Sequence, residues 1–189
     1  ANTDKIAIAT YYPRDIDRMN TFYKVACDNK RFFVISLKTA RLLDRLKDDL
    51  GLALPNILND SNILLYKKKK KKGEYSSSEY YIWERDYLDL PNTVTFKEIS
   101  ENQDKMLLSL NFSDFCELID IKPIPGGHYI HAMSEPFDEE DMIDDEIMHR
   151  WLDHFKLEFH QIHASGHLSE KELIDFISEV KPKKVFPIH

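Results

Sequence analysis

The sequence predicts an α/β fold in which a mainly parallel sheet is flanked by helices. Two observations indicate this. Short apolar runs typical of buried strands alternate with segments whose apolar residues recur every three or four positions, as on one face of a helix. The chain also closes on a predicted strand, helix and second strand over residues 159–188. Such βαβ connections are normally parallel and right-handed.

Composition limits the kind of protein this is. The 189 residues, 42% of them hydrophobic, are enough for one domain with a small appendage. No apolar run is long enough to span a membrane, and no signal-peptide pattern is present. Cys27 and Cys116 are few and widely spaced, which indicates structural thiols in a reducing cytoplasm. The net charge of −7 argues against non-specific coating of nucleic acid, so any RNA contact must come from a local patch or from backbone donors.

The first third of the chain alternates regularly between strands and helices. Strands are predicted at residues 6–9, 31–35 and 63–66. One helix is predicted over residues 15–29, with Asp15 at its acidic start, and a second is predicted to be capped by Thr39 and to end near Gly51. Arg14 and Arg18, one turn apart, face a phosphate or an inter-domain partner, or else form an exposed helix face.

The middle is less regular. Six consecutive lysines, Lys67 to Lys72, repel one another and predict a mobile loop or hairpin tip, which is either a contact for RNA phosphates or a solvated loop. The aromatic residues that follow are interpreted either as base-stacking side chains or as a core face at helical spacing; they are Tyr80, Tyr81, Trp83 and Tyr87.

The second half continues the alternation. Strands are predicted at residues 94–99, 106–110 and 128–133, a short helix at 113–119, and a break at 123–127. Ser134-Glu135-Pro136 is predicted to open the longest helix, which ends near Phe155. Ser134 and Glu135 therefore occupy a strand-to-helix turn at the carboxyl edge of the sheet.

The C-terminal segment has the most specific pattern. After a strand at 159–162, a loop over 164–167 leads into a helix whose start is a capping box of Ser169 and Glu172. A last strand over 184–188 ends on His189. In a parallel unit His167 and His189 converge at the carboxyl edge, where Gly166 and the helix start suit an anion such as phosphate. Two solvent-facing histidines are the alternative.

These residues resemble the β-CASP family of metallo-β-lactamase-fold nucleases, which includes ribonuclease J and the archaeal mRNA 3′-end processing factors. The resemblance rests on the motif at residues 163–167 (HASGH) followed by Pro187-Ile188-His189, and extends to residues 13–18 and 126–140. It implies that residues 1–157 are a β-CASP domain. Residues 158–189 would be a partial return segment, a βαβ unit belonging to the metallo-β-lactamase fold.

The resemblance also implies roles for single residues. His167 would contact the scissile phosphate and help with proton transfer, and His189 would ligate a metal ion. The residues that would face RNA or its phosphates are Ser165, Gly166, Ser134 and Glu135.

The implied function is phosphodiester hydrolysis of single-stranded RNA by a parent ribonuclease, as exonuclease or endonuclease, with two divalent ions (zinc or manganese). The family's His-x-His-x-Asp-His cluster is absent from this chain. We therefore expect a fragment that is inactive alone and holds no catalytic metal, whose partners are RNA, the missing metallo-β-lactamase domain and a possible second copy. One alternative is an inactive β-CASP RNA-binding or scaffold module. Another is a domain that binds a small phosphorylated ligand at the loop over 165–167.

Overall fold

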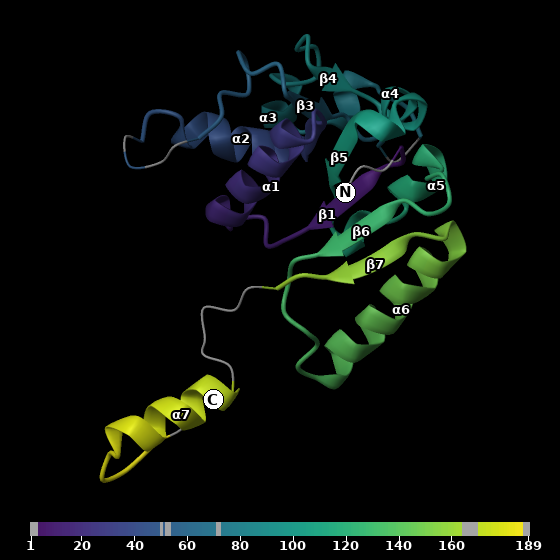
Figure 1. The fold of residues 1–189 in the computed structure, drawn as a ribbon. Coiled ribbons are helices and arrows are strands. Elements are labelled where there is room, and N and C mark those ends of the chain that lie inside the picture. Colours follow the sequence, from purple (N-terminus) through teal and green to yellow (C-terminus); the bar gives the residue numbers. More distant parts are fainter. Residues whose placement is uncertain (1–3, 50, 52–53, 71–72, 164–169, 187–189) are drawn as a thin grey trace.

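A computed structural model describes residues 4–49, 51, 54–70, 73–163 and 170–186 of the chain. Its described strands form one sheet in the order β4-β3-β2-β5-β1-β6-β7, and every pairing is parallel (Figure 1). The predicted α/β fold class is therefore confirmed. The strands are β1 (Ala7–Thr10), β2 (Phe32–Ser36), β3 (Ile63–Tyr66), β4 (Thr93–Val94), β5 (Met106–Ser109), β6 (His128–His131) and β7 (Glu158–Gln161).

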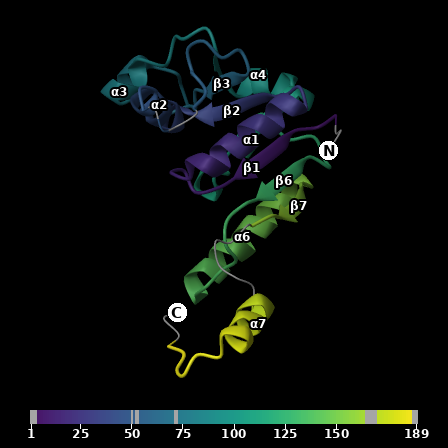
Figure 2. The same cartoon turned by 60° about the vertical axis from the view of Figure 1, so that its left-hand side comes forward.

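Helices cover both faces of this sheet. The α-helices are α1 (Ile16–Asp28), α2 (Leu37–Leu46), α3 (Ile82–Arg85), α4 (Phe96–Glu101), α5 (Glu117–Ile121), α6 (Glu139–Phe155) and α7 (Glu170–Val180). Short 3-10 helices are η1 (Ser77–Glu79), η2 (Gln103–Lys105) and η3 (Phe112–Asp114). Helices α1, α2 and α3 pack on one face, and α4, α5 and α6 pack on the other (Figures 1 and 2).

Alternation along the strands divides the core in two. Ile8 of β1 points toward the face covered by α6, while its neighbour Ala9 points toward the face covered by α1. The α1 face buries Phe33 and Leu43, and the α6 face buries Phe115 and Tyr129. A central parallel strand is buried on both faces, which explains why its sequence is a continuous apolar run.

Helix capping changes three of the predicted boundaries, and α2 also ends at Leu46 and not near Gly51. Residues 94–99 are mostly helix α4, since Thr95 and Glu98 form a capping box. Helix α2 is capped by Ser36, whose hydroxyl oxygen accepts a hydrogen bond from the Thr39 amide at 3.1 Å. Ser36 is therefore the cap, and Thr39 is the residue whose amide is capped. Helix α6 begins at Glu139 behind Asp138, and residues 134–136 belong to the preceding loop.

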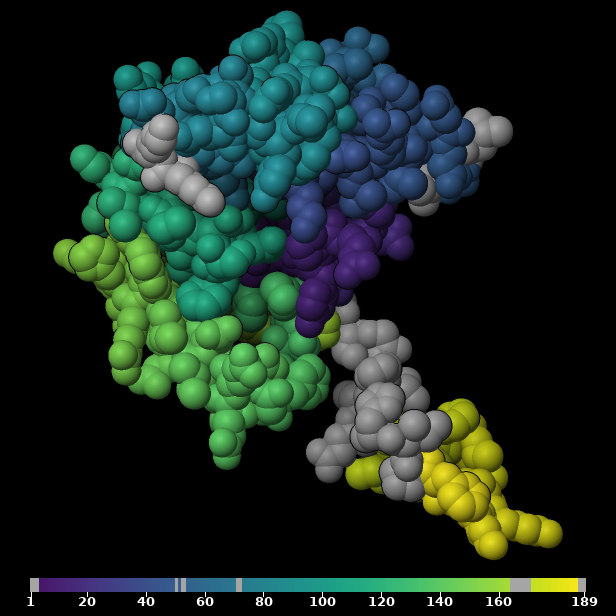
Figure 3. Space-filling view, turned by 180° about the vertical axis from the view of Figure 1, so that it is seen from behind, coloured from purple at the N-terminus to yellow at the C-terminus, as the bar shows by residue number. Residues whose placement is uncertain are grey.

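The C-terminal unit differs from its prediction. Strand β7 pairs with β6, and α7 follows, but residues 184–186 are not in a strand. The apolar residues Leu173, Ile174, Phe176 and Val180 of α7 are each 47–56% exposed. Helix α7 stands apart from the sheet, as Figure 3 also shows. A strand needs a neighbour for its backbone hydrogen bonds, and the described part of the chain places none beside residues 184–186.

The sequence predicts structural thiols and no membrane-spanning run. Cys27 and Cys116 are both free thiols. No helix in the described ranges has the length and apolar character needed to cross a membrane.

Candidate functional site

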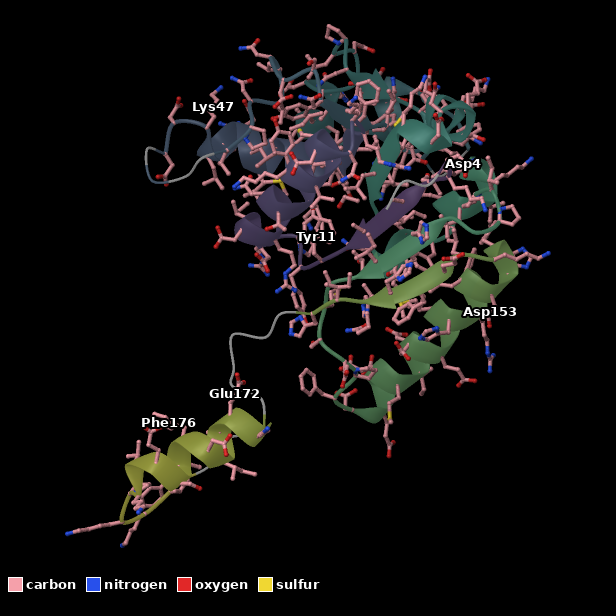
Figure 4. All side chains as sticks on the ribbon, viewed as in Figure 1. Asp4, Tyr11, Lys47, Asp153, Glu172 and Phe176 are labelled. Atoms are coloured by element: carbon pink, nitrogen blue, oxygen red, sulfur yellow. The ribbon has the colours of Figure 1, made fainter. Side chains whose placement is uncertain are left out.

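The strand order places a topological switch point between β1 and β5. These strands are neighbours, yet β1 leads into α1 on one face and β5 leads toward α5 on the other. The carboxyl ends of such strands leave a crevice where open α/β sheets bind ligands. Two cavities, of about 390 and 360 Å³, meet there and share Pro13, Asn111 and Ser113 in their walls. Tyr11, labelled in Figure 4, marks the end of β1.

Hydroxyl groups at the ends of strands line the larger of these two cavities. Its walls include Ser36, Tyr66 and Ser109, which end β2, β3 and β5. The Ser109 hydroxyl donates to Tyr11 Oη at 3.1 Å. Burial raises the pKa of Tyr11 to about 12, so the phenol stays neutral at physiological pH and serves as a hydrogen-bonding group rather than a base.

A basic groove continues from this cavity. It encloses about 560 Å³ and shares Pro13, Lys38 and Thr39 with the cavity above. Four of its seven lining residues are cations and none is acidic: Arg14, Lys38, Arg41 and Arg45. Arg14, Lys38 and Arg45 are exposed and form no ion pair with an acidic side chain in the described part of the chain. Cations held this way suit the phosphates of a polyanion.

The cavity on the other side of the switch point is acidic. The predicted residues Ser134 and Glu135 lie here, between β6 and α6, as expected for a turn at the carboxyl edge. Ser134 Oγ lies 3.0 Å from Tyr12 Oη. The remaining acidic wall comes from the first half of α6, namely Asp141, Asp144 and Asp145. Phosphates are therefore favoured toward α2 and disfavoured toward α6.

The exit of β7 lies at this same edge. The Gln161 side-chain amide donates to Met133 O at 2.8 Å, and Arg18 donates to Ala132 O. Arg18 Nη1 also lies 3.2 Å from His163 Nδ1. The described chain therefore brings His163, which follows β7, beside Arg18 and the segment that follows β6. Ser165, Gly166, His167 and His189 lie outside the described residues.

The lysine run is packed, contrary to the expected mobile loop. Lys68, Lys69 and Lys70 form ion pairs with Asp114 at 2.6 Å, Asp120 at 2.9 Å and Glu84 at 2.8 Å, respectively. Their charge repulsion is relieved by acids from distant segments, which the local sequence does not reveal. Lys71 and Lys72 lie outside the described residues.

The aromatic residues divide into a core group and an exposed side chain, and the base-stacking interpretation stays a prediction for the exposed one. Tyr80 and Tyr87 are buried in the core, 2% and 7% exposed. Tyr81 is 70% exposed and stacks on Trp83, with ring centroids 6.4 Å apart and planes 7° apart. The guanidinium of Arg41 lies 4.9 Å from the Trp83 ring, so this aromatic pair adjoins the basic groove.

Sequence reasoning missed the cations of α2. Lys38, Arg41 and Arg45 are separated by three and four residues, the spacing of one helix face. A count of charges by helical position would have found them.

Within the described ranges, no three His, Cys, Asp or Glu side chains converge at the carboxyl edge. The two-ion centre implied by the resemblance is therefore not matched by these residues, since such centres need about three protein ligands per ion.

The structure is a parallel α/β domain whose carboxyl edge has a basic groove on one side of the switch point and an acidic cavity on the other. Residues 153–189, which span the end of α6, β7 and α7, match the family described as Zn-dependent metallo-hydrolase RNA specificity domain. This match supports a relationship to the metallo-β-lactamase/β-CASP family. Comparison with curated protein sequences finds no match.

Proposed function

We propose that this chain is the RNA-binding part of a metal-dependent ribonuclease. The observation that supports this best is the basic groove, with four cations and no acid in its walls. The groove joins the crevice at the switch point, so a strand of RNA lying in it leads toward the exit of β7. The similarity of residues 153–189 to an RNA specificity domain supports the same ligand.

RNA is held in this proposal by two kinds of contact. Arg14, Lys38 and Arg45 neutralise successive phosphates, which provides affinity without sequence preference. Tyr81, exposed beside the groove and stacked on Trp83, offers a ring face to an unpaired base. Base stacking of this kind requires a single strand, because the bases of a duplex are already stacked.

The parent enzyme is proposed to carry its catalytic centre outside the described residues. Residues 1–157 form the β-CASP domain, and residues 158–189 return to a metallo-β-lactamase domain that holds two zinc or manganese ions. The exposed apolar side of α7 docks on that domain. His167 and His189 serve there as the phosphate-contacting and metal-ligating histidines, beside Ser165 and Gly166. Such an enzyme acts in RNA processing or decay in the cytoplasm, alone or as a homodimer.

The test is to neutralise the groove. In Lys38→Gln/Arg45→Gln, we expect the affinity for a single-stranded RNA of about a dozen nucleotides to fall at least tenfold by fluorescence anisotropy. The slope of log K against log salt is negative, and each lost phosphate contact reduces its magnitude by about 0.7. For the double variant we therefore expect a slope that is shallower by about 1.4.

The matched control is Lys97→Gln/Lys105→Gln, which removes the same charge from exposed positions on the α4 side of the molecule. We expect it to keep nearly the full affinity and slope. Equal losses in the two double variants would mean that net charge, and not the groove, governs RNA binding.

A further inference from the structure

Three metal-ligating side chains converge at the opposite end of β6 from Ser134. His128 opens β6, Glu158 opens β7, and His160 is two residues farther along β7. In the parallel register Glu158 lies opposite His128, and His160 lies opposite Ile130. Because side chains alternate along a strand, all three project from the same face of the sheet.

The distances suit a single ion. His128 Nδ1 lies 2.9 Å from His160 Nε2 and 3.4 Å from Glu158 Oε2. One ligand atom from each residue lies within 4.8 Å of the other two. Tetrahedral zinc, with bonds of about 2.0–2.2 Å to nitrogen and oxygen, requires ligand atoms about 3.3 Å apart. The separations of 2.9 and 3.4 Å differ from that spacing by a few tenths of an ångström.

The surroundings leave room for a fourth ligand. A cavity of about 250 Å³ is lined by both histidines and reaches the exposed Ile162. The Glu158 side chain is 59% exposed, whereas the His128 side chain is 20% exposed. Two imidazoles and a carboxylate with water in the fourth position are an established zinc donor set.

We propose that His128, Glu158 and His160 bind one Zn²⁺ ion, which links β7 to β6. Strand β7 ends the sheet and is hydrogen-bonded to β6 alone among the described strands. An ion shared by the two strands adds a cross-link at their amino ends. It holds in place the strand that carries the chain toward His163.

The experiment is equilibrium dialysis of the untagged chain against zinc chloride, with bound metal measured by mass spectrometry. We expect one zinc per chain. Glu158→Gln keeps the shape of an exposed side chain, so it should leave the fold unchanged and weaken zinc binding at least tenfold. His160→Gln should do the same. His154→Gln, on the exposed side of α6, is the matched control and should bind zinc normally.

Other outcomes would overturn the proposal. The ion would lie on the C-terminal motif if zinc binding stayed complete in Glu158→Gln and His160→Gln but was lost in His167→Gln or His189→Gln. No binding by the folded wild-type chain would mean that the two imidazoles only share a hydrogen bond. Cobalt(II) absorption gives an independent measurement, because a tetrahedral site has a spectrum different from that of the hydrated ion. RNA affinity should be unchanged in Glu158→Gln, which separates this test from that of the basic groove.

Discussion

Glu117 is an acidic residue held in a partly buried position. It starts α5, and the Tyr66 hydroxyl donates to its carboxylate at 2.5 Å. Burial raises the pKa of Glu117 above its ordinary value of 4.5, although the Tyr66 hydrogen bond and Lys68 act in the opposite direction. The folded state therefore binds the proton more tightly than the unfolded chain, and this residue's contribution to stability falls as pH rises from 4.5 through the folded pKa.

Glu117→Gln removes this titration. Relative to the wild type, we expect the variant to gain stability as pH rises from about 5 to about 7.5, measured by urea unfolding at both values. Tyr66→Phe removes a hydrogen bond that lowers the pKa of Glu117. Between about pH 5 and about pH 7.5 we therefore expect the Tyr66→Phe variant to lose more stability than the wild type loses. A wild-type-to-variant difference that is constant with pH would show that the carboxyl group titrates normally.

Single residues were predictable where their position follows from local order. Ser134 and Glu135 lie at the carboxyl edge because they follow a parallel strand. Tyr80 and Tyr81 are adjacent and chemically identical, yet one is 2% and the other 70% exposed. Both residues precede α3, with extended ψ values of 146° and 150°, so adjacent side chains point to opposite sides and the helical spacing of the sequence does not apply to them.

Helix α2 shows how much one cap determines. Ser36 ends β2 and also caps α2, so the chain passes from strand to helix without a loop. This abrupt turn places Lys38 at the mouth of the crevice, beside Thr39. The cap therefore positions the first cation of the basic groove.

Ser36→Ala should lower the free energy of unfolding by about 1 kcal/mol, because the Thr39 amide loses its side-chain acceptor. Chemical denaturation measures this directly. Ser113→Ala is the control, since Ser113 is exposed and provides no cap for η3; we expect a change within about 0.5 kcal/mol. Equal effects of both substitutions would show that the Ser36 cap contributes nothing specific.

Helix α7 was predictable as a helix but not as an isolated one. Its apolar residues recur at helical spacing, and periodicity requires only that some surface covers them. In the described structure they are exposed, and the strand expected after the helix is not formed at residues 184–186. Periodicity shows that a partner surface is required; it does not show which chain supplies that surface.

The sheet as a whole carries the basic groove at its carboxyl edge, and among its described residues no three metal-ligating side chains converge there. We therefore expect the chain alone to bind single-stranded RNA without cutting it when zinc or manganese is added. Labelled RNA on a denaturing gel measures this. Metal-dependent cleavage that weakens in Lys38→Gln/Arg45→Gln would contradict the expectation, whereas cleavage unaffected by those substitutions would come from a contaminating nuclease.

The sequence by itself determined the α/β class, the parallel direction of the strands and the place of Ser134, because hydrophobic periodicity and chain order are local properties. Tertiary structure decided the strand order, the switch point between β1 and β5, and the ion pairs that hold the lysine run. It also brought Arg14 beside α2 and His128 beside Glu158 and His160. These features join residues far apart in the chain, and their energies depend on distances that exist only after the sheet has formed.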